Sequence, residues 1–169
     1  MPNYKKVQPV IQSGWYTCWA AAMSWWTYAM QDRARKVMTE QDMLDEFPYD
    51  WDKNGAMTIQ GMSKIFNAQK FLMKCRFSGA GDFDRLIYKL SDDPIKAFDA
   101  FPIVVGYNDP NAGGNHIAVI CEFDSTDVTY QKFVVMDPAR GYRVRSRNYL
   151  ASQSMIFAWP TEAGDIIYG

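Results

Sequence analysis

The chain has 169 residues, of which 48% are hydrophobic and 22% charged, and its net charge at pH 7 is −1. These values are typical of an ordinary globular protein, and we expect residues 1–169 to form a single domain. A net charge so close to zero provides no long-range field for nucleic acid or an anionic membrane, so neither is an expected partner.

The first half of the chain reads as mainly helical. Residues 4–11 contain Pro9 and are expected to be extended. Residues 15–30 are apolar on nearly every side, which predicts a buried central helix. Three further helices and one strand are predicted from caps and periodicity: helices over 40–47 (with Thr39 as N-cap), 58–69 and 82–90, and a strand over 71–77.

The second half consists of short β-branched and aromatic runs separated by turn residues. They predict strands over residues 102–107, 115–123, 132–136, 142–146 and 156–159. Helices followed by strands indicate an α+β fold, with a helical N-terminal half packed on a C-terminal antiparallel sheet.

Cysteine usage and the N-terminus limit the class further. Cys18, Cys75 and Cys121 are far apart and form no C-x-x-C pair, so neither a disulfide framework nor a zinc site is expected, and no cofactor is implied. The sequence shows no signal peptide and no apolar run of the roughly 20 residues that a membrane span needs. These features favour an intracellular protein or a domain of a larger one.

Cys18 is the candidate nucleophile because it begins the predicted central helix after the break at Ser13-Gly14. A helix N-terminus has a partial positive charge and free N–H groups, which favour a thiolate and a developing oxyanion. Gln12 lies six residues earlier, where its side-chain amide could point at the same spot. The alternative interpretation is that Cys18 is a small core residue.

His116 is the chain's one histidine and opens an apolar strand after a polar loop, and Asp137 ends the next predicted strand. If the two strands pair antiparallel, both residues lie at the same end of the ladder. The carboxylate could then bond one imidazole nitrogen and leave the other for the thiol. Taken singly, the two residues have plainer interpretations, as a core or surface histidine and an Asp-Pro turn.

One segment resembles the signature of the papain-like cysteine proteases, in which a glutamine precedes a Cys-Trp-Ala helix start: Gln12-Ser-Gly-Trp-Tyr-Thr-Cys18-Trp19-Ala20-Ala21. Two further blocks are similar to those of the compact bacterial members, namely Gly114-Asn115-His116 and Met136-Asp137-Pro138. These members include effector proteases of bacterial pathogens and the peptidase domains of bacteriocin exporters. Plant and lysosomal members usually have Asn where Asp137 stands.

The resemblance implies a papain-like fold and an amide-hydrolysing triad. In it Cys18 attacks, His116 transfers the proton, Asp137 fixes the imidazole tautomer, and Gln12 with the Cys18 N–H holds the oxyanion. Trp19 and Asn115 are the candidate substrate-binding residues.

The expected activity is that of an endopeptidase on a specific protein substrate, of the bacterial effector or interbacterial-toxin kind. Its partners would include a cognate immunity or inhibitor protein, and it would act in the cytoplasm or be delivered into a target cell by a bacterial secretion system. Two alternatives stay open. The first is a papain-fold amidase, deamidase or transglutaminase acting on peptidoglycan or a side-chain amide, and the second is a non-enzymatic binding module.

Three further patterns have plainer interpretations. Arg143, Arg145 and Arg147 alternate, which indicates a solvated strand face, or else a docking surface for an acidic partner. Residues 50–55 match half of a calcium loop, but Gly61 stands where a glutamate is needed, so a polar turn is expected. Three rings lie beside the candidate nucleophile: Trp15, Tyr16 and Trp19. Most of them are expected to pack in the core, and one could line a substrate groove.

Overall fold

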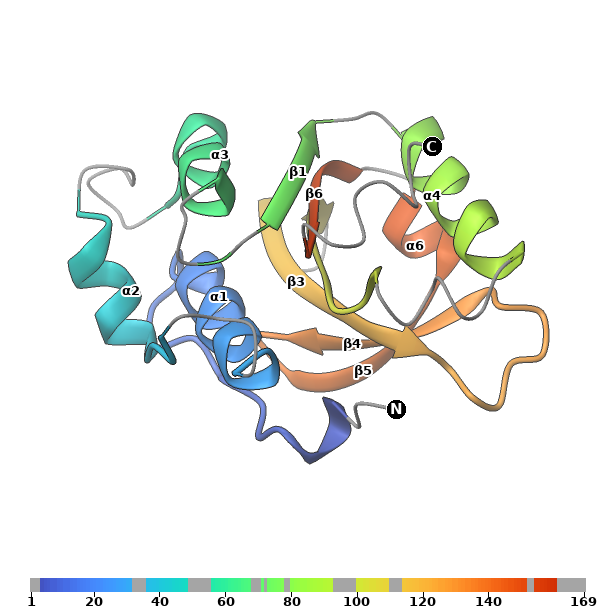
Figure 1. Cartoon of the computed structure of the whole chain (residues 1–169), viewed down its shortest axis with the longest axis horizontal. Coiled ribbons are helices and arrows are strands. Elements are labelled where there is room, and N and C mark those ends of the chain that lie inside the picture. The colour runs from blue at the N-terminus through green and yellow to red at the C-terminus, as the bar shows by residue number, and fades with distance from the viewer. Residues whose placement is uncertain are drawn as a thin grey trace.

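The computed structural model describes residues 4–31, 36–48, 56–67, 71, 73–77, 80–92, 100–109, 114–151 and 154–160. Helices predominate in the first part of the chain and strands in the second (Figure 1), and the elements follow in this order: η1 (Tyr4–Lys6), α1 (Cys18–Ala29), α2 (Glu40–Glu46), α3 (Ile59–Asn67), β1 (Met73–Phe77), α4 (Ala80–Asp92), β2 (Ile103–Asp109), β3 (Gly114–Phe123), β4 (Lys132–Asp137), β5 (Gly141–Ser146), α6 (Arg147–Ala151) and β6 (Ser154–Pro160). The predicted α+β class is confirmed.

The described strands form one six-stranded sheet in the order β1-β6-β2-β3-β4-β5. Each neighbouring pair is antiparallel. β3 pairs with β2 on one side, where His116 lies opposite Tyr107. It pairs with β4 on the other side, where Val119 lies opposite Met136. The antiparallel β3–β4 pair is the arrangement that the sequence analysis required for His116 and Asp137.

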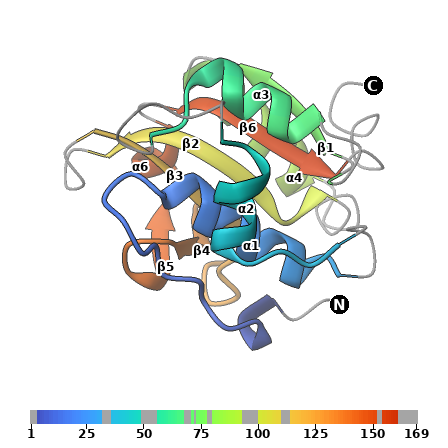
Figure 2. The same ribbon diagram turned by 90° about the vertical axis from the view of Figure 1, so that its left-hand side faces the viewer.

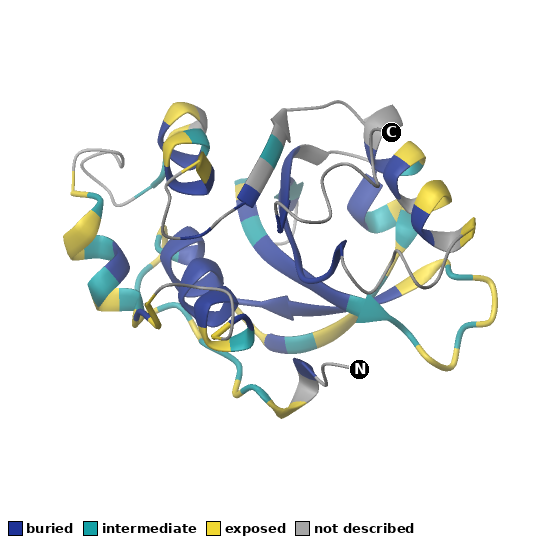
Figure 3. Ribbon diagram, viewed as in Figure 1, coloured by how far each residue is buried: buried dark blue, intermediate teal, exposed yellow. Residues whose placement is uncertain are grey.

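The buried central helix predicted from its apolar residues is α1. All its residues from Cys18 to Thr27 are buried, and the helix appears dark blue over most of its length in Figure 3. α1 packs against β3 and α2, while α4 and α6 lie on the other side of the sheet (Figure 1 and Figure 2). The nucleophile candidate therefore begins a helix that is fixed on several sides.

Three details differ from the expected elements. α1 begins at Cys18 and not at Trp15, because Thr17 provides the first helical acceptor through Ala21 N–H···O Thr17 at 3.1 Å. Part of the expected extended lead-in is the 3-10 helix Tyr4–Lys6. The short helix α6 has no counterpart among the predicted elements.

Within the described residues, no helix combines the length and apolar character that crossing a membrane requires. The segment 50–55, weighed above as half of a calcium loop, lies outside the described residues.

Candidate active site

A cavity of about 660 Å³ opens where α1 begins, beside β3. Five of the six residues predicted to form a site line this cavity: Gln12, Cys18, Trp19, Asn115 and His116. Cys18 is largely buried, with 9% of its surface exposed. The structure therefore brings to one place residues that are about 100 positions apart, and it leaves the sulfur at the edge of an open space.

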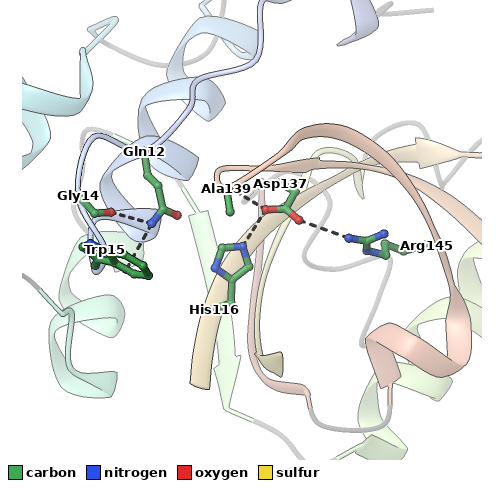
Figure 4. A network of polar contacts seen from close by, with 7 residues as sticks. All are labelled: Gln12, Gly14, Trp15, His116, Asp137, Ala139 and Arg145. Carbon is green, nitrogen blue, oxygen red and sulfur yellow. Dashed lines mark hydrogen bonds and ion pairs between the residues drawn. The ribbon is translucent and has the colours of Figure 1, made fainter. Parts of the chain in front are cut away.

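Asp137, the sixth predicted residue, lies behind the imidazole of His116. His116 Nε2 is 3.0 Å from Asp137 Oδ1, and both side chains are buried, at 4% and 1% exposure. The same oxygen accepts the Ala139 N–H at 2.9 Å, and Oδ2 lies 3.5 Å from Arg145 Nη2 (Figure 4). Because Nε2 donates to the carboxylate, Nδ1 is the ring nitrogen left for the sulfur.

Cys18 lies near enough to His116 to affect the pKa of the imidazole. Burial lowers the pKa of His116, but the hydrogen bond to Asp137 and the electrostatic influence of Cys18 and Asp137 outweigh it and raise the pKa to about 9. The imidazole is therefore protonated at neutral pH. A protonated imidazole beside a cysteine stabilises the thiolate, which is the nucleophilic form of the side chain.

The Asp137 carboxylate is held in its ionised form. Burial alone would raise its pKa, but the hydrogen bond and charge of His116, the Ala139 N–H and the charge of Arg145 together lower it. The ionised carboxylate therefore lies beside the protonated imidazole and is hydrogen-bonded to it.

Arg145 was interpreted from the sequence as part of a solvated strand face, and this is wrong for that residue. Its guanidinium reaches back along β5 to Asp137 and lies over the Tyr149 ring, with Cζ 4.9 Å from the ring centroid. Arg147 pairs with Asp84 at 2.8 Å from its position in α6. Arg143 alone of the three is exposed. The three arginines therefore do not share one strand face, because β5 ends at Ser146 and Arg147 belongs to α6.

Tyr107 is a second site residue that the sequence analysis missed. Its ring meets the imidazole of His116 edge-on, with centroids 5.8 Å apart. Burial, followed by the negative charges of Asp137, Tyr149 and Asp109, raises the pKa of Tyr107. The Tyr107 ring thus packs against His116 from the β2 side. The signal that could have found Tyr107 is its position opposite His116, a candidate catalytic residue, on the neighbouring strand.

Gln12 lies at the cavity, but its amide faces its own loop. Nε2 donates to Gly14 O at 2.7 Å and to Trp15 O at 3.3 Å, while Oε1 is buried without a partner among the described residues (Figure 4). The Gln12 backbone N–H donates to Pro138 O at 2.9 Å, which ties the segment to the turn after Asp137. Both amide hydrogens are thus engaged away from Cys18 in this conformation.

Most of the rings beside Cys18 were expected to pack in the core, but only one of the three does. Trp19 is buried, whereas Trp15 is 93% exposed and Tyr16 52% exposed, and all three line the cavity. Both exposed rings precede α1, since the helix begins only at Cys18. Asn115 is exposed at the same mouth. The cavity therefore presents apolar surface to whatever enters it.

No carboxylate belongs to the described residues that line the cavity, and its cationic side chains are His116 and Arg140. Within the same part of the chain, no group of three or more His, Cys, Asp or Glu residues is arranged to hold a metal ion. The chemistry that the arrangement supports is that of a sulfur nucleophile, an imidazole and a carboxylate.

No protein-family model matches the sequence, and a search of curated proteins finds no significant match. Among solved structures, the peptidase domain of Streptococcus ComA, described as a bifunctional ABC transporter in a quorum-sensing pathway, is similar with a TM-score of 0.59 at 14% identity, over 91% of this chain and 98% of that one. A double-glycine-motif protease from an AMS/PCAT transporter, solved with a leader peptide, has a TM-score of 0.54 at 15% identity, over 91% and 97%. The chain therefore has the papain-like fold of these peptidase domains.

Proposed function

We propose that the chain is a papain-like cysteine peptidase that hydrolyses a peptide bond in a protein or peptide substrate. The observation that carries this proposal is that Cys18 and His116 line one open cavity, with Asp137 hydrogen-bonded to the far side of the imidazole. The similar solved structures support it, because both are peptidase domains and one binds a leader peptide.

The proposed reaction starts from the protonated imidazole of His116 beside Cys18. The Cys18 thiolate attacks the carbonyl carbon of the scissile amide, and the C–N bond breaks as Nδ1 of His116 gives its proton to the leaving nitrogen. The imidazole, now neutral, takes a proton from a water molecule whose oxygen attacks the thioester. The acid is released, and the thiolate–imidazolium pair is restored. Asp137 keeps Nε2 engaged throughout.

The oxyanion that forms during attack needs donors near the sulfur. The backbone N–H of Cys18 is one, because the first N–H groups of a helix have no partner within the helix. Gln12 is the other in this proposal. Its bond to Gly14 O at 2.7 Å keeps the nitrogen in place, and the longer one to Trp15 O at 3.3 Å is exchanged for the oxyanion.

Substrate contacts in this proposal come from Trp19, Asn115 and the exposed ring of Trp15 around the cavity. An effector or toxin role, and a cognate immunity or inhibitor protein, stay predictions from the sequence resemblance. The proposed reaction depends on neither of them.

Mass spectrometry of cells or peptide libraries exposed to the protein and to its Cys18→Ala variant tests the proposal. We expect new peptide termini with the wild type and none with Cys18→Ala, while Cys75→Ala, which changes a thiol away from the cavity, keeps the activity. A one-dalton gain or the incorporation of an amine would instead identify a deamidase or a transglutaminase. No product, together with no faster iodoacetamide labelling of Cys18 than of Cys75, would indicate a binding module.

A further inference from the structure

The helix α2 begins with a carboxylate that reaches the segment leading into Cys18. Glu40 accepts the Ser13 N–H with both oxygens, at 3.0 Å to Oε1 and 3.1 Å to Oε2. Oε1 also accepts the hydroxyl of Thr17 at 2.6 Å. One side chain thus holds both ends of the segment Ser13–Thr17, which precedes the candidate nucleophile.

Thr17 is the N-cap residue of α1, yet its side chain makes no capping hydrogen bond to that helix. Thr39, the N-cap of α2, shows the usual behaviour, because its Oγ1 accepts the Asp42 N–H at 3.1 Å. The Thr17 hydroxyl is instead turned to Glu40 and accepts the Gly14 N–H at 3.0 Å. The contact with Glu40 therefore leaves the first N–H groups of α1 uncovered by the residue that would ordinarily cap them.

α2 is a firm support for this carboxylate. Its first turn is closed by a capping box in which the Thr39 N–H donates to Asp42 Oδ2 at 2.8 Å. Met43 anchors the helix in the core, and α2 packs on α1. Glu40 therefore links two helices that are already fixed relative to each other.

We propose that Glu40 is a positioning residue for the nucleophile. By binding Ser13 and the Thr17 hydroxyl, it fixes the approach to α1 and keeps the Thr17 side chain off the first N–H groups of that helix. The Cys18 sulfur and its backbone N–H then stand ready for attack and for the oxyanion. This inference rests on the proposed peptidase function, although its effect on the geometry around Cys18 is measurable without a substrate.

The test compares Glu40→Ala and Glu40→Gln with Asp42→Ala. We expect Glu40→Ala to lower kcat by about 10- to 100-fold with little change in KM, because a small misplacement of a nucleophile is that costly. Glu40→Gln retains an oxygen at Oε1 for both Ser13 and Thr17, so it should restore most of kcat. Asp42→Ala removes the capping box of the same helix but leaves the Glu40 contacts, so it should lower stability and spare kcat.

Alkylation of Cys18 by iodoacetamide, followed by mass spectrometry, provides the second readout. Glu40→Ala should slow labelling of Cys18 and leave labelling of Cys75 unchanged. Glu40→Ala should slow Cys18 labelling less in a Thr17→Val background than in the wild type, because the hydroxyl that Glu40 binds is already absent.

Two results would overturn the inference: equal kinetic losses in Glu40→Ala and Asp42→Ala, or an unchanged Cys18 labelling rate in Glu40→Ala. Rapid labelling of Cys18 without any cleavage by the wild type counts against the peptidase proposal instead. In that case the labelling rates of the Glu40 variants still decide whether Glu40 positions Cys18.

Discussion

The imidazole of His116 and the carboxylate of Asp137 meet at 3.0 Å across neighbouring strands, although 21 positions separate them in the chain. Both groups are almost completely buried, and each stabilises the charged form of the other. The pKa of His116 rises to about 9, and that of Asp137 falls below its ordinary value. The site therefore holds a fixed positive charge beside Cys18 at neutral pH, and the pH dependence of the protein follows from it.

Peptidase activity should decline as the pH rises through about 9, where His116 loses the proton that it gives to the leaving nitrogen in the proposed reaction. In Asp137→Asn the carboxylate that raises this pKa is absent, so the alkaline limb should move to lower pH and the maximal rate should fall. A profile of kcat/KM against pH for both proteins measures this. An alkaline limb at the same pH in Asp137→Asn would contradict the assigned role.

Stability should also fall on the alkaline side. The pKa of His116 in the folded state lies above the ordinary 6.5. Its contribution to the free energy of unfolding is therefore complete below pH 6.5 and is lost as the pH rises to about 9. The loss is on the order of 3 kcal/mol, since each pKa unit between 6.5 and about 9 corresponds to about 1.4 kcal/mol. Urea unfolding between pH 6 and 10 measures it, and Asp137→Asn should show a smaller change over that range.

Replacing Arg145 with methionine should destabilise the fold by about 1 to 2 kcal/mol, because Asp137 loses one of its charged partners inside the protein. The pKa of Asp137 is lowered in the folded state, so its contribution to the free energy of unfolding is present at neutral pH and is lost on acidification. In Arg145→Met this loss should begin at a higher pH. Arg143→Met, an exposed arginine of the same strand, is the control and should behave as the wild type in acid unfolding experiments.

The local pattern of the chain predicted most elements well. β3 was expected over residues 115–123 and spans Gly114–Phe123, and β4 was expected over 132–136 and spans Lys132–Asp137. Hydropathy alternation and turn residues are local signals, so they can be read from sequence. The order of the strands in the sheet depends on contacts between distant parts of the sequence. For example, β1 joins the sheet by pairing with β6, which comes about 80 residues later in the chain.

The errors near the site have a physical pattern. The helix was expected to begin at Trp15 because apolar residues continue back to it, yet the turn from Gly14 to Thr17 leaves that ring in solvent. Arg145 and Glu40 were missed because both act through long side chains on partners from other elements. Cys18, His116 and Asp137 could be proposed from the sequence because each lies at or near the end of an element.

Gln12→Ala should lower kcat by about 100- to 1,000-fold, as expected for the loss of an oxyanion donor, with a smaller change in KM. Gln12→Glu, which has the same shape but no amide hydrogens, should lose a similar factor. Gln41→Glu on the exposed side of α2 is a control for added charge. If the Gln12 variants lost stability but retained kcat, the amide would serve only to bind Gly14 and Trp15.

Trp15→Ala should raise KM for peptide substrates several-fold and leave kcat and stability nearly unchanged. The ring is 93% exposed at the cavity, so its removal takes little from the folded state. Tyr88→Ala on α4 removes another exposed ring, 67% accessible, that does not line the cavity, and its KM should match that of the wild type. Equal KM values for the two variants would show that Trp15 makes no contact with the substrate.

Gly106→Ala should destabilise the protein by about 1 to 3 kcal/mol, because the centre of the sheet has no room for a side chain there. An added Cβ would lie 2.6 Å from Ile156 Cγ2 and 2.9 Å from Ile117 Cδ1, which reach over β2 from the strands on either side. Ile156→Leu removes the Cγ2 branch, so the double variant should be less destabilised than the sum of the two single changes. Urea unfolding of all four proteins measures this coupling. If the losses of stability were additive, the added Cβ would not collide with Ile156 Cγ2. An unchanged stability of Gly106→Ala would contradict the packing of β2 between β3 and β6 beneath the cavity.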